Sequence, residues 1–512
     1  MSSLNRFQAS WINAIQESNS NCSTDFPSYP CSDPHSLVST SRPRSFEVGT
    51  GASIYTYSLL PAILQAKEEV ILVTCFWAPS STLTALSDTL KQLARLRKDY
   101  YSSQEPAHMG HEALPPLNIR ICFSSRSFFQ KLFHPSSKAG YTYPPSKWVS
   151  QLGLPDPRIL EAGLINLEVK SLFFLPFSVM HPKFLIIDRH RAWLPSCNVS
   201  RAPWLECCVE ITGEAVASLL RFYHGVWGQY KEDSTRLPVT ADLGRQLDGV
   251  VDLHRVGLTS IQSPARRLVS LQLGTTPTII LPSSHHRNPR LRPLPWQQYP
   301  RPPSTPLNCA ILRLFAMAEK KIYLQTPNLT SAAVIDSLLG ALDRGVDVTV
   351  VTSKGMMVLE QLLTGGTTTS WCLRSFIKLY TKRQRQSSRS ASESTGDDSN
   401  AMSDLQSQCP SLGSLEVFYF HPLPTNQKLK VPEEPVHSHL KLTMVDDEWV
   451  VLGSGNMDRA SWFTSQELGI LFQSKEFVAE VGDAVSQALR GRLTLLFTSK
   501  NDHGSSPNST RR

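Results

Sequence analysis

Two stretches of the chain share a pattern of polar residues that indicates its fold. Residues 181–204 read HPKFLIIDRHRAWLPSCNVSRAPW, and residues 439–462 read HLKLTMVDDEWVVLGSGNMDRASW. Aligned without a gap, matched residues are separated by 258 positions. The matched pairs are His181 and His439, Lys183 and Lys441, Asp188 and Asp446, Ser196 and Ser454, Asn198 and Asn456, Arg201 and Arg459, and Trp204 and Trp462. The chain therefore contains an internal repeat of an H-x-K-x4-D motif.

The residue types in this repeat favour a catalytic interpretation over a structural one. A repeat that served packing alone would preserve apolar positions and would have little reason to preserve histidine, lysine, serine and asparagine. Two weaker similarities extend the match. Residues 167–169 and 415–417 both read LEV, and Glu210 in VEITG resembles Glu467 in QELGI. We therefore expect two duplicated halves that both carry chemistry.

The segments around the two motifs predict an α/β fold. Helical patterns alternate with short apolar runs of strand length in both halves. The expected helices are residues 53–67, 81–98, 307–319 and 331–344, and the expected strands are residues 69–76, 117–123, 320–325 and 346–352. This alternation predicts a largely parallel sheet covered on both faces.

Composition divides the chain into two halves and four less regular segments. We expect the first half at residues 45–235 and the second at residues 306–499. Serine-, asparagine- and proline-rich sequence predicts a loose segment at residues 1–44, and a proline- and arginine-rich stretch predicts a linker at residues 236–305. The remaining expected segments are a disordered serine-rich insertion at residues 381–412 and a tail at residues 500–512.

Charge and hydropathy do not identify the class of substrate. A net charge of +8 over 512 residues suits an anionic substrate but does not distinguish a phospholipid surface from nucleic acid. The ten cysteines form no regular framework, which is typical of a reducing compartment. The N-terminus lacks the apolar region of a secretory signal, and no run of 18 apolar residues is present. We therefore expect a cytoplasmic protein, or one bound peripherally to an intracellular membrane, with no transmembrane helix.

The motif places histidine and lysine in a favourable arrangement for phosphodiester cleavage. Side chains at positions i and i+2 of an extended strand point the same way, so His181 and Lys183 share a face. Two such lysines would neutralise the phosphate oxygens and stabilise the transition state without a metal. The hydroxyl and amide groups of Ser196, Asn198, Ser454 and Asn456 would donate further hydrogen bonds to the phosphate.

The two histidines divide the remaining chemistry. One neutral imidazole would attack phosphorus and form a covalent phosphohistidine, while the other would protonate the leaving group and then deprotonate the incoming water or alcohol. Carboxylates would orient the imidazoles, and Glu210 and Glu467 are the candidates. Asp188 and Asp446 complete the expected catalytic motifs, with bracing of the backbone as an alternative role.

These residues resemble the HKD signature of the phospholipase D superfamily. The sequence Gly453-Ser454-Gly455-Asn456 also matches the G-S-x-N element of that family, whereas the first copy has Pro195 and Cys197 at the glycine positions. The spacing is most similar to cardiolipin synthase and phospholipase D-like proteins. The resemblance implies two α/β/α halves packed with pseudo-twofold symmetry around one active site. It also implies that His181 is the nucleophile and His439 the general acid.

Three functions are consistent with these observations. The first is a phospholipid phosphodiesterase or phosphatidyltransferase that works at a membrane surface. The second is a nuclease or DNA-end-processing phosphodiesterase, and the third is a non-catalytic scaffold, although both motifs are intact. We expect no cofactor and no metal site, since His285 and His286 lack partners at ligand spacing. Two motifs in one chain mean that a monomer suffices for a complete site.

Overall fold

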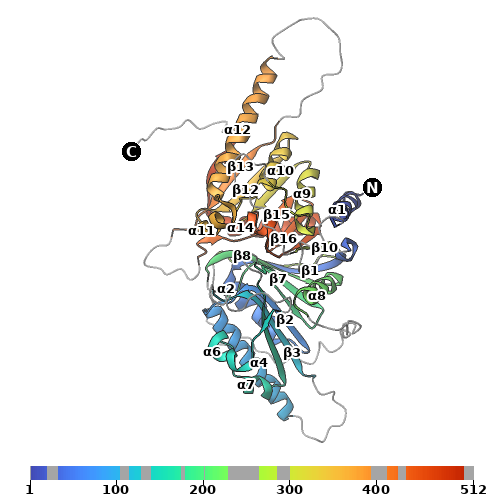
Figure 1. The fold of residues 1–512 in the computed structure, drawn as a ribbon, viewed down its shortest axis with the longest axis vertical. Coiled ribbons are helices and arrows are strands. Elements are labelled where there is room, and N and C mark those ends of the chain that lie inside the picture. Colours follow the sequence, from blue (N-terminus) through green and yellow to red (C-terminus); the bar gives the residue numbers. More distant parts are fainter. Residues whose placement is uncertain are drawn as a thin grey trace.

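The fold consists of two α/β halves that follow one another along the chain. The computed structural model describes residues 2–19, 33–103, 115–127, 140–173, 179–200, 202–228, 264–284, 300–393, 412–424 and 434–500. The first half is drawn in blue to green and the second in yellow to red, one below the other in Figure 1. His285, His286 and Arg201 lie outside the described residues.

The first half contains nine strands and their covering helices among the described residues. Its elements are β1 (Val38–Thr50), α2 (Gly51–Ile54), α3 (Leu60–Leu64), β2 (Glu69–Phe76), α4 (Ser81–Ser103), β3 (Leu117–Ser125), β4 (Tyr141–Thr142), α6 (Trp148–Leu152), α7 (Pro157–Ala162), β5 (Ile165–Ser171), β6 (Phe184–Ile187), β7 (Arg191–Pro195), β8 (Trp204–Thr212), α8 (Glu214–Trp227) and β9 (Arg267–Ser270).

The second half largely repeats this order. Its elements are β10 (Thr276–Ser283), α9 (Pro306–Met317), β11 (Lys321–Gln325), α10 (Ala332–Asp343), β12 (Asp347–Ser353), α11 (Val358–Gly365), α12 (Thr369–Glu393), β13 (Leu415–Phe420), β14 (His437–Ser438), β15 (Leu442–Val445), β16 (Trp449–Gly453), α13 (Arg459–Phe463), β17 (Glu467–Gln473), α14 (Lys475–Leu489) and β18 (Leu493–Thr498).

Strand pairing shows the duplication directly. The first sheet runs β5–β3–β2–β6–β7–β8–β1, and the second runs β13–β12–β11–β15–β16–β17–β10 in the same order. The two sheets are joined where β1 pairs with β10, at Val38 opposite Ile279. The expected α/β fold with two duplicated halves is therefore confirmed.

The expectation of a largely parallel sheet is wrong. Only β2, β3 and β5 are mutually parallel in the first half, as are β11, β12 and β13 in the second, apart from the short β14 beside β8. Each motif strand returns through a tight turn that forces an antiparallel pair. The turns contain Asp188 and Arg189, and Asp446 and Asp447, all with positive φ.

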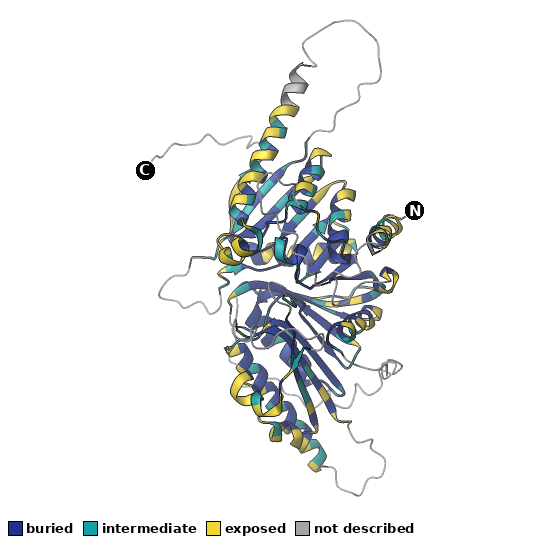
Figure 2. Cartoon of the chain, in the orientation of Figure 1, coloured by how far each residue is buried: buried dark blue, intermediate teal, exposed yellow. Residues whose placement is uncertain are grey.

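A central hydrophobic core belongs to both halves. It contains Phe46, Phe184 and Phe222 from the first half and Phe472 and Phe477 from the second. Helix α8 packs on β1, β8 and β10, while α14 packs on β1, β9 and β16. Each half also has an outer core beneath its own helices, and buried residues fill both sheets (Figure 2). This shared core holds the two motif strands in a defined relation.

Three segments differ from expectation. Residues 3–19, predicted to be loose, form α1 (Ser3–Asn19), because Phe7 and Trp11 are buried against the second half and Trp11 Nε1 donates to the Pro306 carbonyl at 2.9 Å. The expected linker supplies β9 and the joining strand β10. Helix α12 extends into the expected insertion as far as Glu393, and residues 394–411 lie outside the described residues.

Candidate active site

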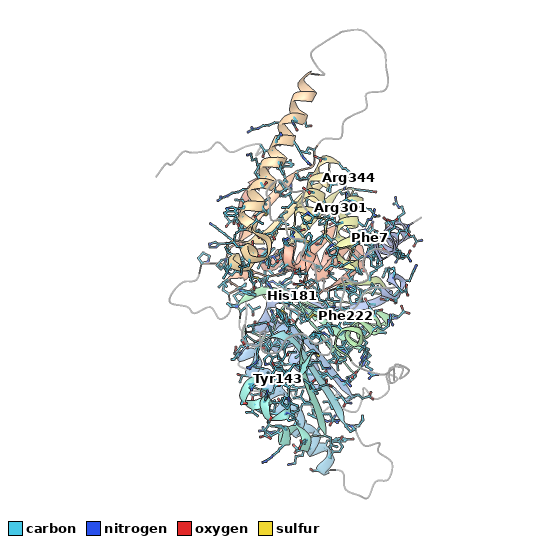
Figure 3. The ribbon with its side chains drawn as sticks, in the orientation of Figure 1. Phe7, Tyr143, His181, Phe222, Arg301 and Arg344 are labelled. Atoms are coloured by element: carbon cyan, nitrogen blue, oxygen red, sulfur yellow. The ribbon has the colours of Figure 1, made fainter. Side chains whose placement is uncertain are left out.

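The two motif histidines lie where the halves meet. His181 precedes β6 and is labelled at the junction of the halves in Figure 3. Its backbone N–H donates to the Gln466 carbonyl of the second half at 2.9 Å, while the His439 N–H donates to the Leu205 carbonyl of the first half at 2.8 Å. Each histidine backbone is thus anchored to a strand, or to the approach to a strand, of the opposite half.

Each imidazole is oriented by a carboxylate from the opposite half. His181 Nδ1 lies 2.8 Å from Glu467 Oε2, and His439 Nδ1 lies 2.7 Å from Glu206 Oε1. An ionised carboxylate only accepts hydrogen bonds, so both Nδ1 atoms carry the proton and both Nε2 atoms keep a lone pair. Burial raises the pKa of each glutamate, but its partner histidine and hydrogen bonds dominate and hold it below its ordinary value.

The hydroxyls of Ser196 and Ser454, which were expected to donate to the phosphate, donate to these carboxylates. Ser454 Oγ donates to Glu467 Oε2 at 2.6 Å and accepts from the Leu468 N–H at 3.0 Å. Ser196 donates to Glu206 and accepts from the Cys207 N–H at 2.9 Å. Because each hydroxyl proton is used on a glutamate, Ser196 and Ser454 act through the carboxylates.

Both lysines are buried beside their histidines, as the motif predicts. Lys183 Nζ donates to the His181 carbonyl at 3.0 Å, and Lys441 Nζ donates to the His439 carbonyl at 2.8 Å. Lys441 Nζ also lies 2.7 Å from His439 Nδ1 and 2.9 Å from His439 Nε2, so it contacts both ring nitrogens. Burial, reinforced by the charge of Lys183 and opposed by Glu206, lowers the pKa of Lys441 to about 7.

The two histidines differ in accessibility. The His181 side chain is 13% exposed and the His439 side chain is 3% exposed. Burial lowers the pKa of His181 and lowers that of His439 to about 3, despite the opposing glutamates. The Trp204 ring packs on His439 at a centroid distance of 4.7 Å. Both imidazoles are therefore neutral near pH 7, and His181 is the more open.

One cavity of about 670 Å³ contains both histidines. The motif asparagines line it: Asn198 Oδ1 accepts from the Cys75 and Phe76 N–H groups, both at 3.2 Å, while Asn456 Nδ2 donates to Asp458 at 3.1 Å. Among the described residues the amide nitrogen of Asn198 makes no hydrogen bond, so it can donate to a ligand. Phe76 and Leu363 belong to the same wall, and Leu363 is 66% exposed.

Comparison with known proteins agrees with this arrangement. A family model described as cardiolipin synthase, phospholipase D-like domain, matches residues 311–488. Phosphatidylserine synthase of Haemophilus influenzae has a similar fold, with 13% identity, a TM-score of 0.50 and coverage of 95% of this chain and 92% of that chain. Residues 311–488 thus match a phospholipase D-like domain model, and the fold of the chain is similar to that of a phosphatidylserine synthase.

Two further solved structures are more distantly similar. Nuc of Salmonella typhimurium, whose structure is described as that of a phospholipase D family member, has 15% identity and a TM-score of 0.23, covering 37% of this chain and 90% of its own. Polyphosphate kinase of Porphyromonas gingivalis has 12% identity and a TM-score of 0.42, covering 89% of this chain and 49% of its own. No curated protein matches the chain by sequence.

Within this phospholipase D fold, the motif aspartates do not reach the histidines. Asp188 accepts from the Lys67, Glu68 and Glu69 N–H groups at 2.8–3.2 Å. Asp446 accepts from the Glu319, Lys320 and Lys321 N–H groups at 2.8–2.9 Å. Both aspartates lie beyond the far ends of β6 and β15, where they brace the starts of β2 and β11. Their position departs from the expected catalytic set and fits the alternative expectation, in which they brace the backbone.

The expected role of Glu210 is also corrected, because Glu206 takes that position. Glu210 accepts from Arg191 Nε at 3.1 Å and from Ser45 Oγ at 3.1 Å. The gapless match fails after Trp462, where the second half has three more residues before its glutamate than the first half has after Trp204. The signal for Glu206 was a charged residue inside the apolar run of β8.

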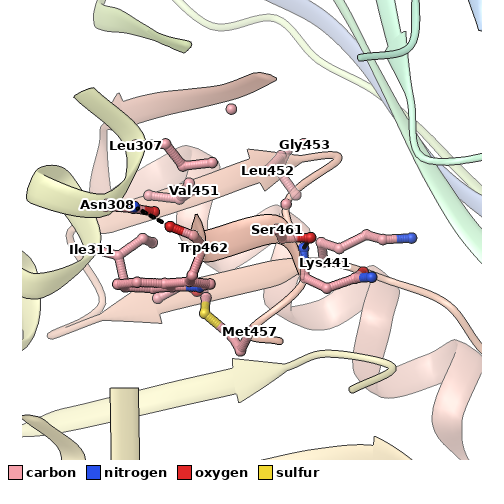
Figure 4. Close-up of a pocket in the computed structure, with 14 residues that line it drawn as sticks. Leu307, Asn308, Ile311, Lys441, Val451, Leu452, Gly453, Met457, Ser461 and Trp462 are labelled. Carbon is pink, nitrogen blue, oxygen red and sulfur yellow. Dashed lines mark hydrogen bonds between the residues drawn. The ribbon is translucent and has the colours of Figure 1, made fainter. Parts of the chain in front are cut away.

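The same insertion makes the two phospholipase D halves unequal around their tryptophans. Trp462 lines a small cavity of about 20 Å³ beside Ile311 and Val451 (Figure 4). Asn308 Nδ2 donates to its carbonyl at 3.0 Å. Trp462 thus packs in the core of the second half, whereas Trp204 packs on the ring of His439.

Two negative findings apply to the described residues only. Among them, no three His, Cys, Asp or Glu side chains are grouped so that they could hold a metal ion. No helix in the described part of the chain combines the length and apolar character needed to cross a membrane.

Proposed function

We propose that this chain is a phospholipid phosphodiesterase, acting by hydrolysis or phosphatidyl transfer through a phosphohistidine intermediate. The observation that carries the proposal is the reciprocal pair of contacts across the halves, Glu467 to His181 and Glu206 to His439. Each contact directs one Nε2 lone pair away from the carboxylate, which is the arrangement that nucleophilic and acid–base histidines require. Both histidines line one cavity, so a single chain has a complete site.

The first step forms the covalent intermediate. His181, the more exposed histidine, attacks phosphorus through Nε2, and the bond from phosphorus to the leaving alcohol breaks. The leaving oxygen takes a proton from His439 Nε2. Because His439 is neutral in the free protein, it takes up this proton from solvent when the substrate binds, since the negative charge of the substrate raises the pKa of a nearby imidazole. Glu206 and Glu467 stabilise the imidazolium forms.

The second step releases the phosphoryl product. Water or an acceptor alcohol attacks phosphorus and gives its proton to His439, and the phosphorus–nitrogen bond to His181 breaks. Lys183, Lys441 and the Asn198 amide stabilise the phosphate oxygens in both transition states. Lys441, with a pKa near 7, gains its full positive charge as the anionic phosphodiester replaces its contact with His439.

The walls of the cavity favour a lipid substrate over a nucleic acid. The residues that line the cavity include the apolar Phe76, Phe173, Val179, Met357 and Leu363. An acyl or glycerol portion would bury itself there, whereas a nucleic-acid backbone is better served by a basic groove. We place the protein at a membrane surface as a peripheral enzyme, with the first half at residues 45–235 and the second at residues 306–499 as its functional units.

The direct test is head-group release from mixed phospholipid vesicles in excess EDTA. We expect release by the wild-type chain and at least a thousandfold slower release by both His181→Ala and His439→Ala, since both steps need both histidines. His190→Ala is the matched control, because His190 is an exposed histidine near the first motif whose Nδ1 faces the Asp188 carbonyl. Release that survives in either active-site variant would contradict the proposal. Cleavage of single-stranded oligonucleotides with no lipid turnover would replace it with a nuclease.

A further inference from the structure

A second cavity adjoins the catalytic one. It has a volume of about 770 Å³ and lies among α10, α11, α12 and α13. Leu363 and Thr364 line both cavities, so only the end of α11 separates them. In Figure 1, α11 lies at the base of α12, close to the junction of the halves. A ligand in this second cavity would therefore sit beside the mouth of the catalytic site.

The floor of the second cavity is polar and suited to an anion. Ser331, the residue before α10, is 1% exposed, and its Oγ has no hydrogen-bond partner among the described residues. The first N–H groups of a helix have no acceptor within the helix and carry a partial positive charge, so α10 directs donors towards the same place. Arg459 adds a guanidinium, whose Cζ lies 4.2 Å from the Phe463 ring centroid.

The outer walls of the second cavity are apolar and unusually exposed. Leu362, Leu363, Trp371 and Leu379 line it, and Trp371 is 56% exposed. Val358 and Leu359 extend the same apolar surface along α11. Figure 2 shows exposed positions on both α11 and α12. Large apolar side chains in contact with water are unfavourable unless a partner covers them, and clusters of this kind mark interaction sites.

Basic residues lie next to this apolar surface on α12. Arg374, Lys378, Lys382 and Arg385 are exposed and spaced by three or four residues, so they form one stripe along the helix. Trp371 and Leu379 follow the same spacing on the neighbouring side. A helix with an apolar side next to a basic side complements a surface of anionic phospholipids.

We propose that the cavity among α10, α11 and α12 binds an anionic phospholipid, with its phosphate at Ser331, Arg459 and the start of α10 and its acyl chains along Trp371, Leu362 and Leu363. The basic stripe of α12 then contacts the surrounding bilayer surface. This lipid holds the membrane against the catalytic cavity, so the inference rests on the proposed phospholipid substrate and adds a separate binding site.

One acidic residue, Asp336, also lines the cavity. Asp336 is placed further along α10 from Ser331, and burial raises its pKa while Arg383 lowers it. The phosphate position at the start of α10 is separated from it by more than one helical turn. The apolar walls favour a phospholipid over a nucleic acid, because a nucleic acid would place polar sugar and phosphate groups against Trp371 and Leu379.

The experiment is co-sedimentation of the full chain with vesicles. Neutral phosphatidylcholine vesicles are compared with vesicles that also contain phosphatidylglycerol. We expect preferential binding of the anionic vesicles, with affinity about tenfold weaker in Ser331→Ala and in Trp371→Ala, since each removes one contact to the lipid. Leu268→Ala, at a similarly exposed apolar residue of the first half, is the matched control and keeps wild-type binding. Ser331→Ala breaks no internal hydrogen bond, so it is expected to fold normally.

Turnover of bis(p-nitrophenyl) phosphate separates this inference from the proposed function. Both variants are expected to hydrolyse this soluble diester within about twofold of the wild-type rate, since neither residue touches the histidines. Wild-type vesicle binding by Ser331→Ala and Trp371→Ala would overturn the lipid site even if the diester is hydrolysed. Inorganic phosphate that stabilises the wild-type chain but not Ser331→Ala, with equal vesicle binding, would replace the lipid by a free anion. Loss of oligonucleotide binding alone in these variants would replace it by nucleic acid.

Discussion

Glu206 of the first half lies 2.7 Å from the imidazole of His439 in the second half. Glu467 and His181 form the reverse contact at 2.8 Å. Neither half therefore orients its histidine without a glutamate from the other half. The duplication produces one site, which lies where the two copies meet. The two halves also share one hydrophobic core, which keeps these contacts in place.

Replacing Glu206 by glutamine tests this exchange. Glutamine keeps the volume but presents an amide that can orient His439 in the wrong tautomer and cannot stabilise its protonated form. We expect kcat to fall by about a hundredfold or more, with a smaller change in KM. Glu210→Gln is the matched control in the same strand, because Glu210 bonds to Arg191 and Ser45. Equal effects of the two substitutions on kcat would show that Glu206 has no special role.

Replacing Asp446 by asparagine tests the structural role of the motif aspartates. Asp446 accepts three backbone N–H groups through both carboxylate oxygens, so an amide nitrogen would face at least one donor. We expect the free energy of unfolding to fall by about 1–3 kcal/mol, with kcat per folded molecule nearly unchanged. Denaturant titration and activity measurements check this. Asp447→Asn, at the adjacent exposed residue, should leave stability within about 0.5 kcal/mol. A large loss of kcat in folded Asp446→Asn would return the aspartate to the catalytic set.

Replacing Ser454 by alanine tests the support of Glu467. The Ser454 hydrogen bond lowers the pKa of Glu467, so its removal raises that pKa. Glu467 must be ionised to orient His181, and the acid limb of the kcat/KM profile should therefore move to higher pH. Ser465→Ala, whose Oγ has no hydrogen-bond partner among the described residues, is the control and should leave the acid limb in place. A shift in the opposite direction would be inconsistent with this support.

The buried His439 also predicts a pH dependence of stability. Its folded-state pKa is about 3, below the ordinary value of 6.5, so the unfolded chain binds more protons between these values. Stability from the neutral His439 is complete above about pH 6.5 and is lost as pH falls towards 3, by up to about 1.4 kcal/mol per pH unit. Reversible denaturation between pH 6.5 and 5 should show a steeper loss in the wild-type chain than in His439→Gln. Parallel curves would contradict this prediction.

The sequence predicts the motif residues of the site better than the groups that orient them. Residues of the repeat bring His181, Lys183, His439 and Lys441 together, because two equivalent motifs on equivalent strands must meet in a duplicated fold. Glu206 was missed because three additional residues in the second half break the alignment just before Glu467. Asp188 was placed in the catalytic set because motif spacing does not show which end of a strand faces the substrate.

The fold shows the same limit. Strand and helix positions such as β2 at Glu69–Phe76 follow directly from apolar patterns. Strand direction could not be predicted in this way, because it depends on the tight turns at Asp188 and Asp446. The positive φ values of these residues leave no trace in the hydrophobic pattern of the sequence. The joining strand β10 was not predicted, because it lies next to a proline- and arginine-rich stretch, although its own residues read TPTIILPS.

The central claim is that His181 forms the covalent intermediate while His439 transfers protons. The most direct measurement is trapping of phosphoenzyme from a phosphorus-labelled phospholipid by the His439→Ala variant, followed by mass-spectrometric location of the label. The account predicts that the label accumulates on His181, because the nucleophile remains but protonation of the leaving group and activation of water are impaired. A label trapped on His439 of the His181→Ala variant, with none on His181, would contradict it.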